Sequence, residues 1–254
     1  MVSYASLVNS NKVRDVNPIN RSLGMERLIL FDIDGTLTRS QNGHIPFNEA
    51  LFKTFGVYGD IRTVVPDGNT DPRIVEDIFG KANIEIEIAR EHWEKFALNL
   101  RHSYHQSVQQ GTTTVRALPG TAELLKSLSA HGSCHQGIVT GNFEVTARIK
   151  LEAAGLGSYL SLGAFAGDSS HRPDLPGIAK ARFELSLGKP IQPAQCIIVG
   201  DTPNDLEAAR HNQMKCVLVG TGRYPLEELQ YWQPDACLTD LSDTAVVLKT
   251  VMSL

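Results

Sequence analysis

Asp32 and Asp34 lie one residue apart, immediately after the short apolar run 27–31. A run of this kind is typical of a buried parallel strand, and α/β sheets bind ligands where such strands end. An aspartate carboxylate can attack phosphorus, while a second carboxylate that points elsewhere can transfer protons. Gly35 permits the sharp turn that follows. The spacing therefore indicates that one of the two carboxylates is a nucleophile and the other a general acid and base. A capped turn is the alternative, because Asp and Gly are also common at strand ends for local reasons.

A metal ion is expected beside these two residues, because two ionised carboxylates repel each other and a phosphate. Asp201 follows another apolar run, and Asp205 stands in the first turn of the helix after it. Carboxylate oxygens are the ligands that Mg2+ prefers. The sequence therefore predicts a magnesium site formed by Asp32, Asp34, Asp201 and Asp205. Asp205 could act indirectly by orienting a water or the Asp201 side chain, or it could simply cap its helix.

Phosphate-binding groups are predicted in two further segments. Thr140 ends a strand-like run, and Gly141 and Asn142 follow it at a helix start, where a hydroxyl and free backbone N–H groups suit a phosphate oxygen. The same tripeptide could be an ordinary turn. Phosphoryl transfer also needs a fixed positive charge. Arg172 is the candidate and Lys180, inside the next helix, is the alternative; a solvated loop charge is the competing interpretation of Arg172.

Strands and helices alternate around these residues. Strands are expected at 27–31, 137–140, 159–166, 196–200 and 215–219, with a possible edge strand at 236–238. Helices are expected at 122–130 after a Thr121 cap, from an Asn142 cap to 155, at 177–187 and at 203–212. This alternation predicts a doubly wound, Rossmann-like α/β core with a parallel sheet covered on both faces.

One segment, 39–117, breaks the alternation. It shows helical patterns near 47–55, 72–79 and 85–110 and no convincing strand. We expect an inserted helical cap domain at 39–117 and a core formed by 25–38 and 118–254. Residues 1–24 are polar and are expected to be a flexible tail; a short targeting segment is a weaker alternative.

The composition is that of an ordinary globular protein. The chain has 254 residues, 42% of them hydrophobic, and a formal net charge of −4. That charge gives no overall attraction to nucleic acid or to an anionic membrane, so a phosphate site must be built locally. No stretch is apolar enough to span a bilayer, and no secretory signal is evident. A cytoplasmic location is therefore expected.

The four segments with Asp32, Thr140, Arg172 and Asp201 resemble, in order and spacing, the four motifs of the haloacid dehalogenase superfamily, phosphatase branch, over residues 28–238. The resemblance implies that Asp32 is the nucleophile and Asp34 the general acid and base. It also implies that Thr140 anchors the phosphate, that Arg172 is the positive clamp, and that Asp201 and Asp205 are the metal acids. The superfamily most often has lysine where this chain has Arg172. Its true dehalogenases lack the second aspartate of the first motif, so Asp34 argues against dehalogenation.

The position of the 39–117 insertion is similar to that of the helical cap in the phosphoglycolate phosphatase-like subgroup. Within it, segment 68–73 is similar to a Gly-x-Thr-Asp loop of some caps, which implies that Arg73 could contact the leaving group. The alternative is a turn followed by a helix with Pro72 at its first position. Closure of such a cap would exclude water from the site.

Together, these observations predict a Mg2+-dependent phosphatase that hydrolyses a small phosphomonoester through an aspartyl-phosphate intermediate. A phosphomutase of the same superfamily is the nearest alternative, and a noncatalytic binding protein on this scaffold is a more distant one. A small phosphorylated metabolite is the expected partner. The identity of the ester and the oligomeric state are left open, because fold resemblance does not determine them.

Overall fold

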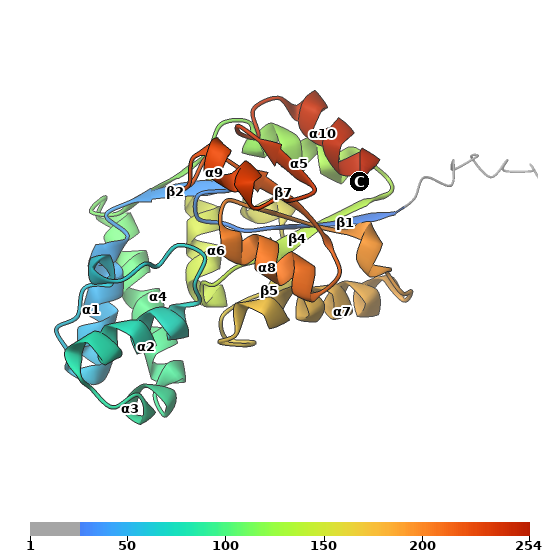
Figure 1. Cartoon of the computed structure of the whole chain (residues 1–254). Helices are drawn as coiled ribbons and strands as arrows, with labels where there is room; N and C mark the ends of the chain where they lie inside the picture. Colours follow the sequence, from blue (N-terminus) through green and yellow to red (C-terminus); the bar gives the residue numbers. More distant parts are fainter. Residues whose placement is uncertain (1–25) are drawn as a thin grey trace, which may run out of the picture.

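The computed structural model describes residues 26–254, so the expected tail 1–24 lies outside the described part. A six-stranded sheet forms the centre, in the order β5-β4-β1-β6-β7-β8, and every neighbouring pair is parallel (Figure 1). The strands are β1 (Arg27–Phe31), β4 (Cys134–Val139), β5 (Gly163–Ala164), β6 (Cys196–Gly200), β7 (Lys215–Val219) and β8 (Ala236–Leu238). The predicted doubly wound α/β core is confirmed.

Helices cover both faces of this sheet. They are α5 (Thr121–Ala130), α6 (Glu144–Ala153), α7 (Leu175–Leu187), α8 (Pro203–His211), α9 (Leu226–Tyr231) and α10 (Thr244–Ser253). Alternate residues of β1 point to opposite faces: Ile29 packs with α5, α6 and α10, while Leu30 packs with α7, α8 and α9. Burial on both faces explains why the strands are almost continuously apolar.

The segment after β1 forms a separate group of helices at one end of the sheet (Figure 1). These are α1 (His44–Phe55), α2 (Asp71–Ala82), α3 (Glu87–Arg90) and α4 (Trp93–Gln109). They share a hydrophobic core that includes Phe47, Phe79 and Phe96. The rings of Phe47 and Phe96 meet edge to face, with centroids 5.5 Å apart. Short 3-10 turns lie at Ile61–Thr63, Gly157–Tyr159, Arg172–Asp174 and Pro193–Gln195.

Two short strands correct the expectation that segment 39–117 has none. β2 (Thr38–Gln41) and β3 (Thr114–Ala117) pair antiparallel and carry the chain into and out of the helices. β2 has only polar residues and β3 has two apolar ones, Val115 and Ala117, which are too few to show a clear apolar pattern. The strand expected at 159–166 is also shorter, since only Gly163–Ala164 pairs with β4.

The expected helix caps are partly wrong. Thr121 lies inside α5, after Gly120, and its hydroxyl donates to the carbonyl of Leu118. Asn142 does not cap α6, because its side chain is used in the site described below. Thr202 does cap α8, in a reciprocal arrangement with Asp205.

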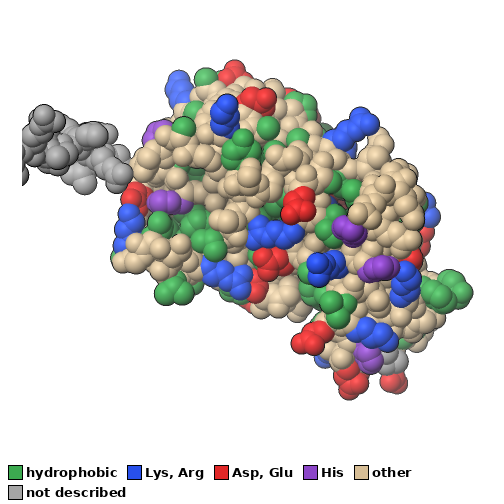
Figure 2. All heavy atoms as spheres, turned by 180° about the vertical axis from the view of Figure 1, so that it is seen from behind, with side chains coloured by type: hydrophobic (Ala, Val, Ile, Leu, Met, Phe, Trp, Pro, Cys, Tyr) green, Lys and Arg blue, Asp and Glu red, His purple; other side chains and the backbone are tan. Residues whose placement is uncertain are grey.

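No helix among residues 26–254 is long and apolar enough to cross a membrane. Figure 2 shows basic and acidic side chains interspersed on one face, without a continuous basic patch.

Candidate active site

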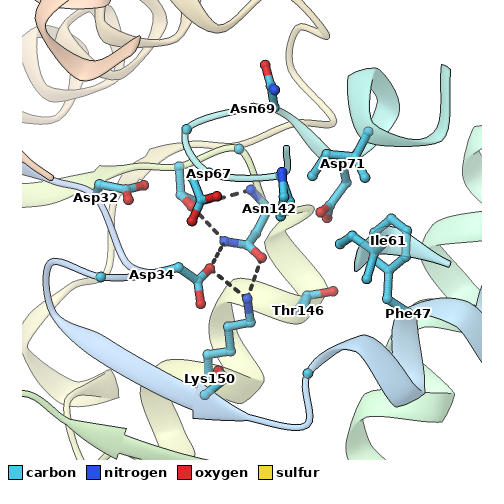
Figure 3. Close-up of a pocket in the computed structure, with 18 of the residues that line it drawn as sticks. Asp32, Asp34, Phe47, Ile61, Asp67, Asn69, Asp71, Asn142, Thr146 and Lys150 are labelled. Atoms are coloured by element: carbon cyan, nitrogen blue, oxygen red, sulfur yellow. Dashed lines mark hydrogen bonds and ion pairs between the residues drawn. The ribbon is translucent and has the colours of Figure 1, made fainter. Parts of the chain in front are cut away.

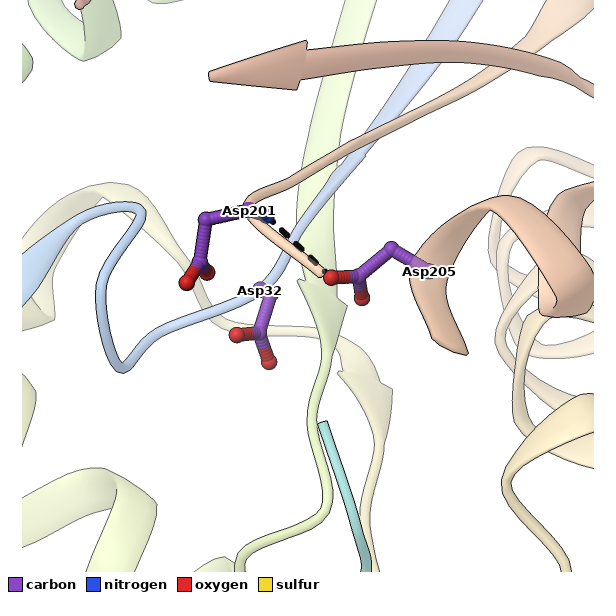
Figure 4. A group of neighbouring side chains, drawn as sticks. All are labelled: Asp32, Asp201 and Asp205. Atoms are coloured by element: carbon purple, nitrogen blue, oxygen red, sulfur yellow. Dashed lines mark hydrogen bonds between the residues drawn. The ribbon is translucent and has the colours of Figure 1, made fainter. Parts of the chain in front are cut away.

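The carboxylates of Asp32, Asp201 and Asp205 form a buried cluster at the carboxyl ends of β1 and β6 (Figure 4). One oxygen from each lies within 4.8 Å of the others, and the three residues are at most 5% exposed. β1 and β6 are adjacent in the sheet, so residues 169 positions apart in the chain meet at one edge. The predicted meeting of Asp32 and Asp201 is therefore present.

Burial makes this cluster electrostatically costly. It raises the pKa of Asp32 to about 7, although the Arg172 guanidinium opposes the shift. It raises the pKa of Asp201 to about 9, and the nearby Asp32 carboxylate adds to the effect. Desolvation and like charges both disfavour the ionised forms. A positive charge among these carboxylates would hold all three ionised.

Arg172 supplies one such charge. Its Nη2 lies 3.1 Å from Asp32 Oδ1 and donates to Asp205 Oδ1. Arg172 itself is 6% exposed, and its loop follows β5. Lys180, the alternative clamp, pairs instead with Glu184 at 2.7 Å on α7 and does not line the cavity. The structure thus places Arg172, and not Lys180, beside the acidic cluster.

Asp205 is largely occupied by protein donors. Its Oδ2 accepts from the Thr202 amide at 3.0 Å, the Thr202 hydroxyl at 2.7 Å and the Asp201 amide at 3.2 Å. These bonds hold the loop that carries Asp201 against the first turn of α8. Asp205 therefore has a positioning role in addition to its charge.

The donor set fits a hard divalent cation. The Thr36 hydroxyl donates to Asp201 Oδ1 at 2.8 Å, which leaves Oδ2 for another ligand. A methyl group on Gly35 or Gly222 would lie only 2.4 or 1.7 Å from that Oδ2, so both positions need glycine. Clustered carboxylate oxygens with one compensating arginine suit Mg2+.

Asp34 points into a different environment from Asp32 (Figure 3). Its Oδ2 accepts from Lys150 Nζ at 2.6 Å and from Asn142 Nδ2 at 2.7 Å. Lys150 also donates to Asn142 Oδ1 at 2.8 Å. The Asp34 side chain is therefore outside the acidic cluster, and its predicted metal contact stays a prediction.

Lys150 was missed by the sequence reasoning. It lies inside α6 and is 5% exposed. Burial alone would lower the pKa of Lys150, but the Asp34 carboxylate raises it above its usual value. Thr146 and Lys150 are four residues apart on one face of α6, and Asn142 lies four residues before Thr146, just ahead of the helix. This four-residue spacing is the sequence signal that could have identified Lys150, but Lys150 does not follow the end of a strand as Asp32, Thr140 and Asp201 do.

Thr140 is fully buried at the end of β4 and lines the same cavity as Asp32. Its hydroxyl accepts from Asn142 Nδ2 at 2.8 Å and from the Asn142 amide at 3.3 Å. The predicted phosphate-binding residues Thr140, Gly141 and Asn142 thus border the space in front of Asp32.

A cavity of about 420 Å³ lies between the sheet edge and the inserted helices. One wall is segment 67–71, which is fastened to the core. The Asp71 amide donates to the Gly141 carbonyl at 2.7 Å, and Asp71 Oδ2 accepts from the Phe143 amide at 2.8 Å. The Thr70 hydroxyl donates to the Ser170 carbonyl at 2.7 Å. The helices are therefore closed over the acidic cluster.

Arg73 requires a correction, because it does not line this cavity. It extends from the exposed side of α2 and pairs with Glu76 at 3.4 Å and Asp77 at 3.3 Å. Its amide donates to the Thr70 hydroxyl, which caps α2. A turn followed by a helix is the alternative interpretation given above for this segment. Asp71, two residues earlier, does line the cavity, together with Gly68 and Asn69.

Comparison with known proteins decides the family. The model of the haloacid dehalogenase-like hydrolase family matches residues 29–219, which include Asp32 and Asp201. The chain belongs to this family. The resemblance inferred from the sequence is therefore confirmed, and the chain is a hydrolase by family.

Several curated relatives align over most of the chain. A phosphoglycolate phosphatase from Pectobacterium atrosepticum is 27% identical over 225 residues, which cover 85% of this chain and 90% of the relative. A probable phosphatase, IndB, from Dickeya dadantii is 25% identical over 91% of this chain and 96% of its own. A pyrophosphatase, PpaX, from Listeria monocytogenes is 25% identical over 87% of this chain and 95% of the relative.

Solved structures support the same fold. A hydrolase from Pseudomonas syringae superposes with a TM-score of 0.61 at 25% identity, over 89% of this chain and 98% of the other. A putative β-phosphoglucomutase from Thermotoga maritima superposes with a TM-score of 0.58 at 14% identity, over 88% of this chain and 98% of the other. The second likeness is one of fold alone.

Proposed function

We propose that the protein is a Mg2+-dependent phosphatase that hydrolyses a small phosphomonoester through a phosphoryl group carried on Asp32. The observation that carries this proposal is the contrast between Asp32 and Asp34. Asp32 lies in the acidic cluster beside Arg172, whereas Asp34 is held by Lys150 and Asn142. Two carboxylates in different environments suit a nucleophile and a proton carrier. The names of the curated relatives agree with phosphate chemistry.

In the first step, an oxygen of Asp32 attacks phosphorus and the bond from phosphorus to the ester oxygen breaks. Asp34 gives its proton to that departing oxygen. In the second step, water attacks the phosphorus of the aspartyl phosphate and passes a proton to Asp34. The bond from phosphorus to Asp32 then breaks, which releases inorganic phosphate. Asp32 and Asp34 are thereby restored.

Arg172 and Thr140 both line the cavity next to Asp32. Thr140 follows β4, which is adjacent to β1, and Arg172 reaches Asp32 from the loop after β5. Arg172 counters the negative charge of the phosphoryl oxygens, and the Thr140 hydroxyl can hydrogen-bond one of them. Asp32, Asp201 and Asp205 would hold Mg2+, which when bound offsets the charge of the carboxylates and of the phosphate.

The first test is phosphate release from p-nitrophenyl phosphate and from a panel of small esters, with Mg2+ and with EDTA. Wild-type protein should release phosphate only with Mg2+, and Asp32→Asn should release none above background. Release by wild type only in the presence of a sugar bisphosphate would instead indicate a phosphomutase. No release under any condition would contradict the phosphatase proposal and favour a binding protein. A cytoplasmic location and a small phosphorylated metabolite as partner belong to the same proposal.

A further inference from the structure

Thr146 carries a buried hydroxyl that the protein does not use. The residue lies in α6, is 1% exposed and lines the cavity. Its Oγ1 has no hydrogen-bond partner among the described residues. A threonine inside a helix often donates to the carbonyl four residues earlier. Here that carbonyl, of Asn142, instead accepts from the Ala166 amide at 2.9 Å. A buried hydroxyl left without a partner costs free energy, so it points to a ligand.

Asp71 provides a second polar group on the cavity wall. One of its oxygens accepts from the Phe143 amide, as described above, which leaves the other available. In the view of Figure 3, Asp71, Thr146 and Phe47 lie to one side of Asn142 and Lys150, while Asp32 lies to the other. On the proposed function, the ester oxygen would depart between Asp32 and Asp34, and the remainder of the leaving group would extend along the cavity toward Asp71 and Thr146.

The charges at this end of the cavity do not favour an anion. Three of the lysine and arginine side chains that line it away from the acidic cluster are paired with carboxylates: Lys150 with Asp34, Arg62 with Asp60 and Arg223 with Asp67. Arg39 donates to the Thr221 carbonyl, beside Gly222, which approaches Asp201. Asp71 itself brings a carboxyl group. A leaving group with its own carboxylate or phosphate would meet this carboxyl group, and the nearby Lys150 is already paired with Asp34.

Apolar side chains form much of the rest of this end. Phe47, Ile61, Ile74 and Leu100 line it, and all but Ile61 are buried. Such a wall suits a short carbon frame. Ser40 and His44 also line the cavity, but both residues are partly exposed, whereas Thr146 and Asp71 are buried.

We propose that Thr146 and Asp71 form the leaving-group subsite and select an uncharged leaving group that presents a hydroxyl group, as in the phosphate of a short polyol. This proposal rests on the proposed function and adds the substrate class. The Thr146 hydroxyl and the free Asp71 oxygen would share the hydrogen bonds of that substrate hydroxyl. A substrate lacking it would leave Thr146 buried and unpartnered, which is the basis of the selection.

Three esters with the same two-carbon frame test the proposal: hydroxyethyl phosphate, ethyl phosphate and phosphoglycolate. Wild type should show kcat/KM for hydroxyethyl phosphate about tenfold above that for ethyl phosphate. It should also favour hydroxyethyl phosphate over phosphoglycolate. Thr146→Val should reduce the hydroxyethyl-to-ethyl ratio to near one, whereas Thr146→Ser, which keeps the hydroxyl, should retain the preference.

Ser103→Ala is the matched control. Ser103 also has a buried hydroxyl without a partner in the described structure, but it does not line the cavity. Its substitution should leave the ratio at the wild-type value, and thermal melting should show that each variant is folded. An unchanged ratio in Thr146→Val, or faster turnover of phosphoglycolate than of hydroxyethyl phosphate, would overturn the subsite.

Different results would contradict the proposed phosphatase function and the proposed leaving-group subsite. If p-nitrophenyl phosphate and all three esters release no phosphate, the proposed function is wrong. The subsite is then judged by calorimetry, where equal affinities of wild type for hydroxyethyl and ethyl phosphate would overturn it. A loss of preference that appears only in Thr146→Val supports it in either assay.

Discussion

The two ends of the cavity are built in different ways. At the sheet end, Asp32, Thr140 and Asp201 each follow the last residue of a parallel strand. At the helical end, Thr146 and Lys150 lie inside α6, and Asp71 starts α2. The sheet end places its groups by backbone topology, because adjacent parallel strands end at one edge. The helical end depends on how α6 packs against the inserted helices.

This difference suggests that the sheet end carries out catalysis and that the helical end selects the substrate. The sheet end gathers the charges that phosphoryl transfer needs, whereas the helical end offers a hydroxyl, a carboxyl group and an apolar wall. We therefore expect substitutions at the sheet end to reduce turnover of every ester, and those at the helical end to act more selectively or through proton transfer.

The largest effect is expected at Arg172. Arg172→Met removes the positive charge beside Asp32 and leaves Asp205 with an unpaired buried charge. We expect kcat to fall about a thousandfold and the protein to lose about 3–5 kcal/mol of stability. Arg172→Lys keeps a charge and should retain more of both. Enzyme assays and denaturant unfolding measure these effects; a methionine variant as active as the lysine variant would contradict the role of the charge.

A smaller effect is expected for Lys150→Met, which frees the Asp34 carboxylate from its ammonium partner. Because the Asp34 side chain would then be held less firmly for proton transfer, kcat should fall about ten- to a hundredfold. The pH–rate profile should change shape as well, and Lys150→Arg should restore part of the rate. Lys180→Met is the control, since Lys180 pairs with Glu184 away from the cavity. An unaltered pH–rate profile in Lys150→Met would rule out action through Asp34.

Gly141→Ala tests whether closure of the helices matters. Its new methyl group would lie 2.0 Å from the Asn69 carbonyl oxygen. We expect segment 67–71 to loosen, KM to rise, and stability to fall by about 1–3 kcal/mol. Gly80→Ala is the control, because nothing lies within 4 Å of its added methyl group in α2, and it should be neutral or slightly stabilising. Equal thermal melting and KM in both variants would contradict the fastening of this loop.

The last expected effect concerns stability and pH at Asp71. Burial raises the pKa of Asp71 to about 7, although Lys150 opposes the shift. The folded state therefore holds the proton more tightly than the unfolded chain, whose pKa is near the ordinary 3.8. Stability from this group is complete below about pH 4 and is lost as pH rises through about 7.

Asp71→Asn removes this dependence. Relative to wild type, the variant should gain stability between pH 5 and pH 8, by an amount on the order of a few kcal/mol, since one pKa unit is worth about 1.4 kcal/mol. Thermal melting at both pH values measures the gain. A constant difference between the two proteins would show that Asp71 ionises as readily in the folded protein as in the unfolded chain.

The sheet end could be predicted from the sequence because its signals are local. Apolar runs ending in Asp32, Thr140 and Asp201 fixed both the strands and the residues at their ends. Arg172 could also be predicted, although its choice over Lys180 needed the structure, which places Lys180 on α7 with Glu184.

The helical end could not be predicted in the same way. Lys150 looks like an ordinary charged helix residue in the sequence, and only packing of α6 against α4 buries it beside the Tyr104 ring, 5.5 Å away. Asp71 and Arg73 lie two residues apart in the first turn of α2, and the direction of that helix decides which of them faces inward. The short strands β2 and β3 were missed because each has four residues, β2 has no apolar residue, and two apolar residues in β3 are too few to establish a period.

The most direct test of the central claim is to trap the phosphoryl group. Asp34→Asn should slow attack of water on the aspartyl phosphate, so acid quenching during turnover of p-nitrophenyl phosphate with Mg2+ should leave phosphate on the enzyme. Peptide mass spectrometry should find it on Asp32, and Asp32→Asn should carry none. Turnover without a phosphorylated peptide at any quench time, or phosphate on a residue other than Asp32, would contradict the account.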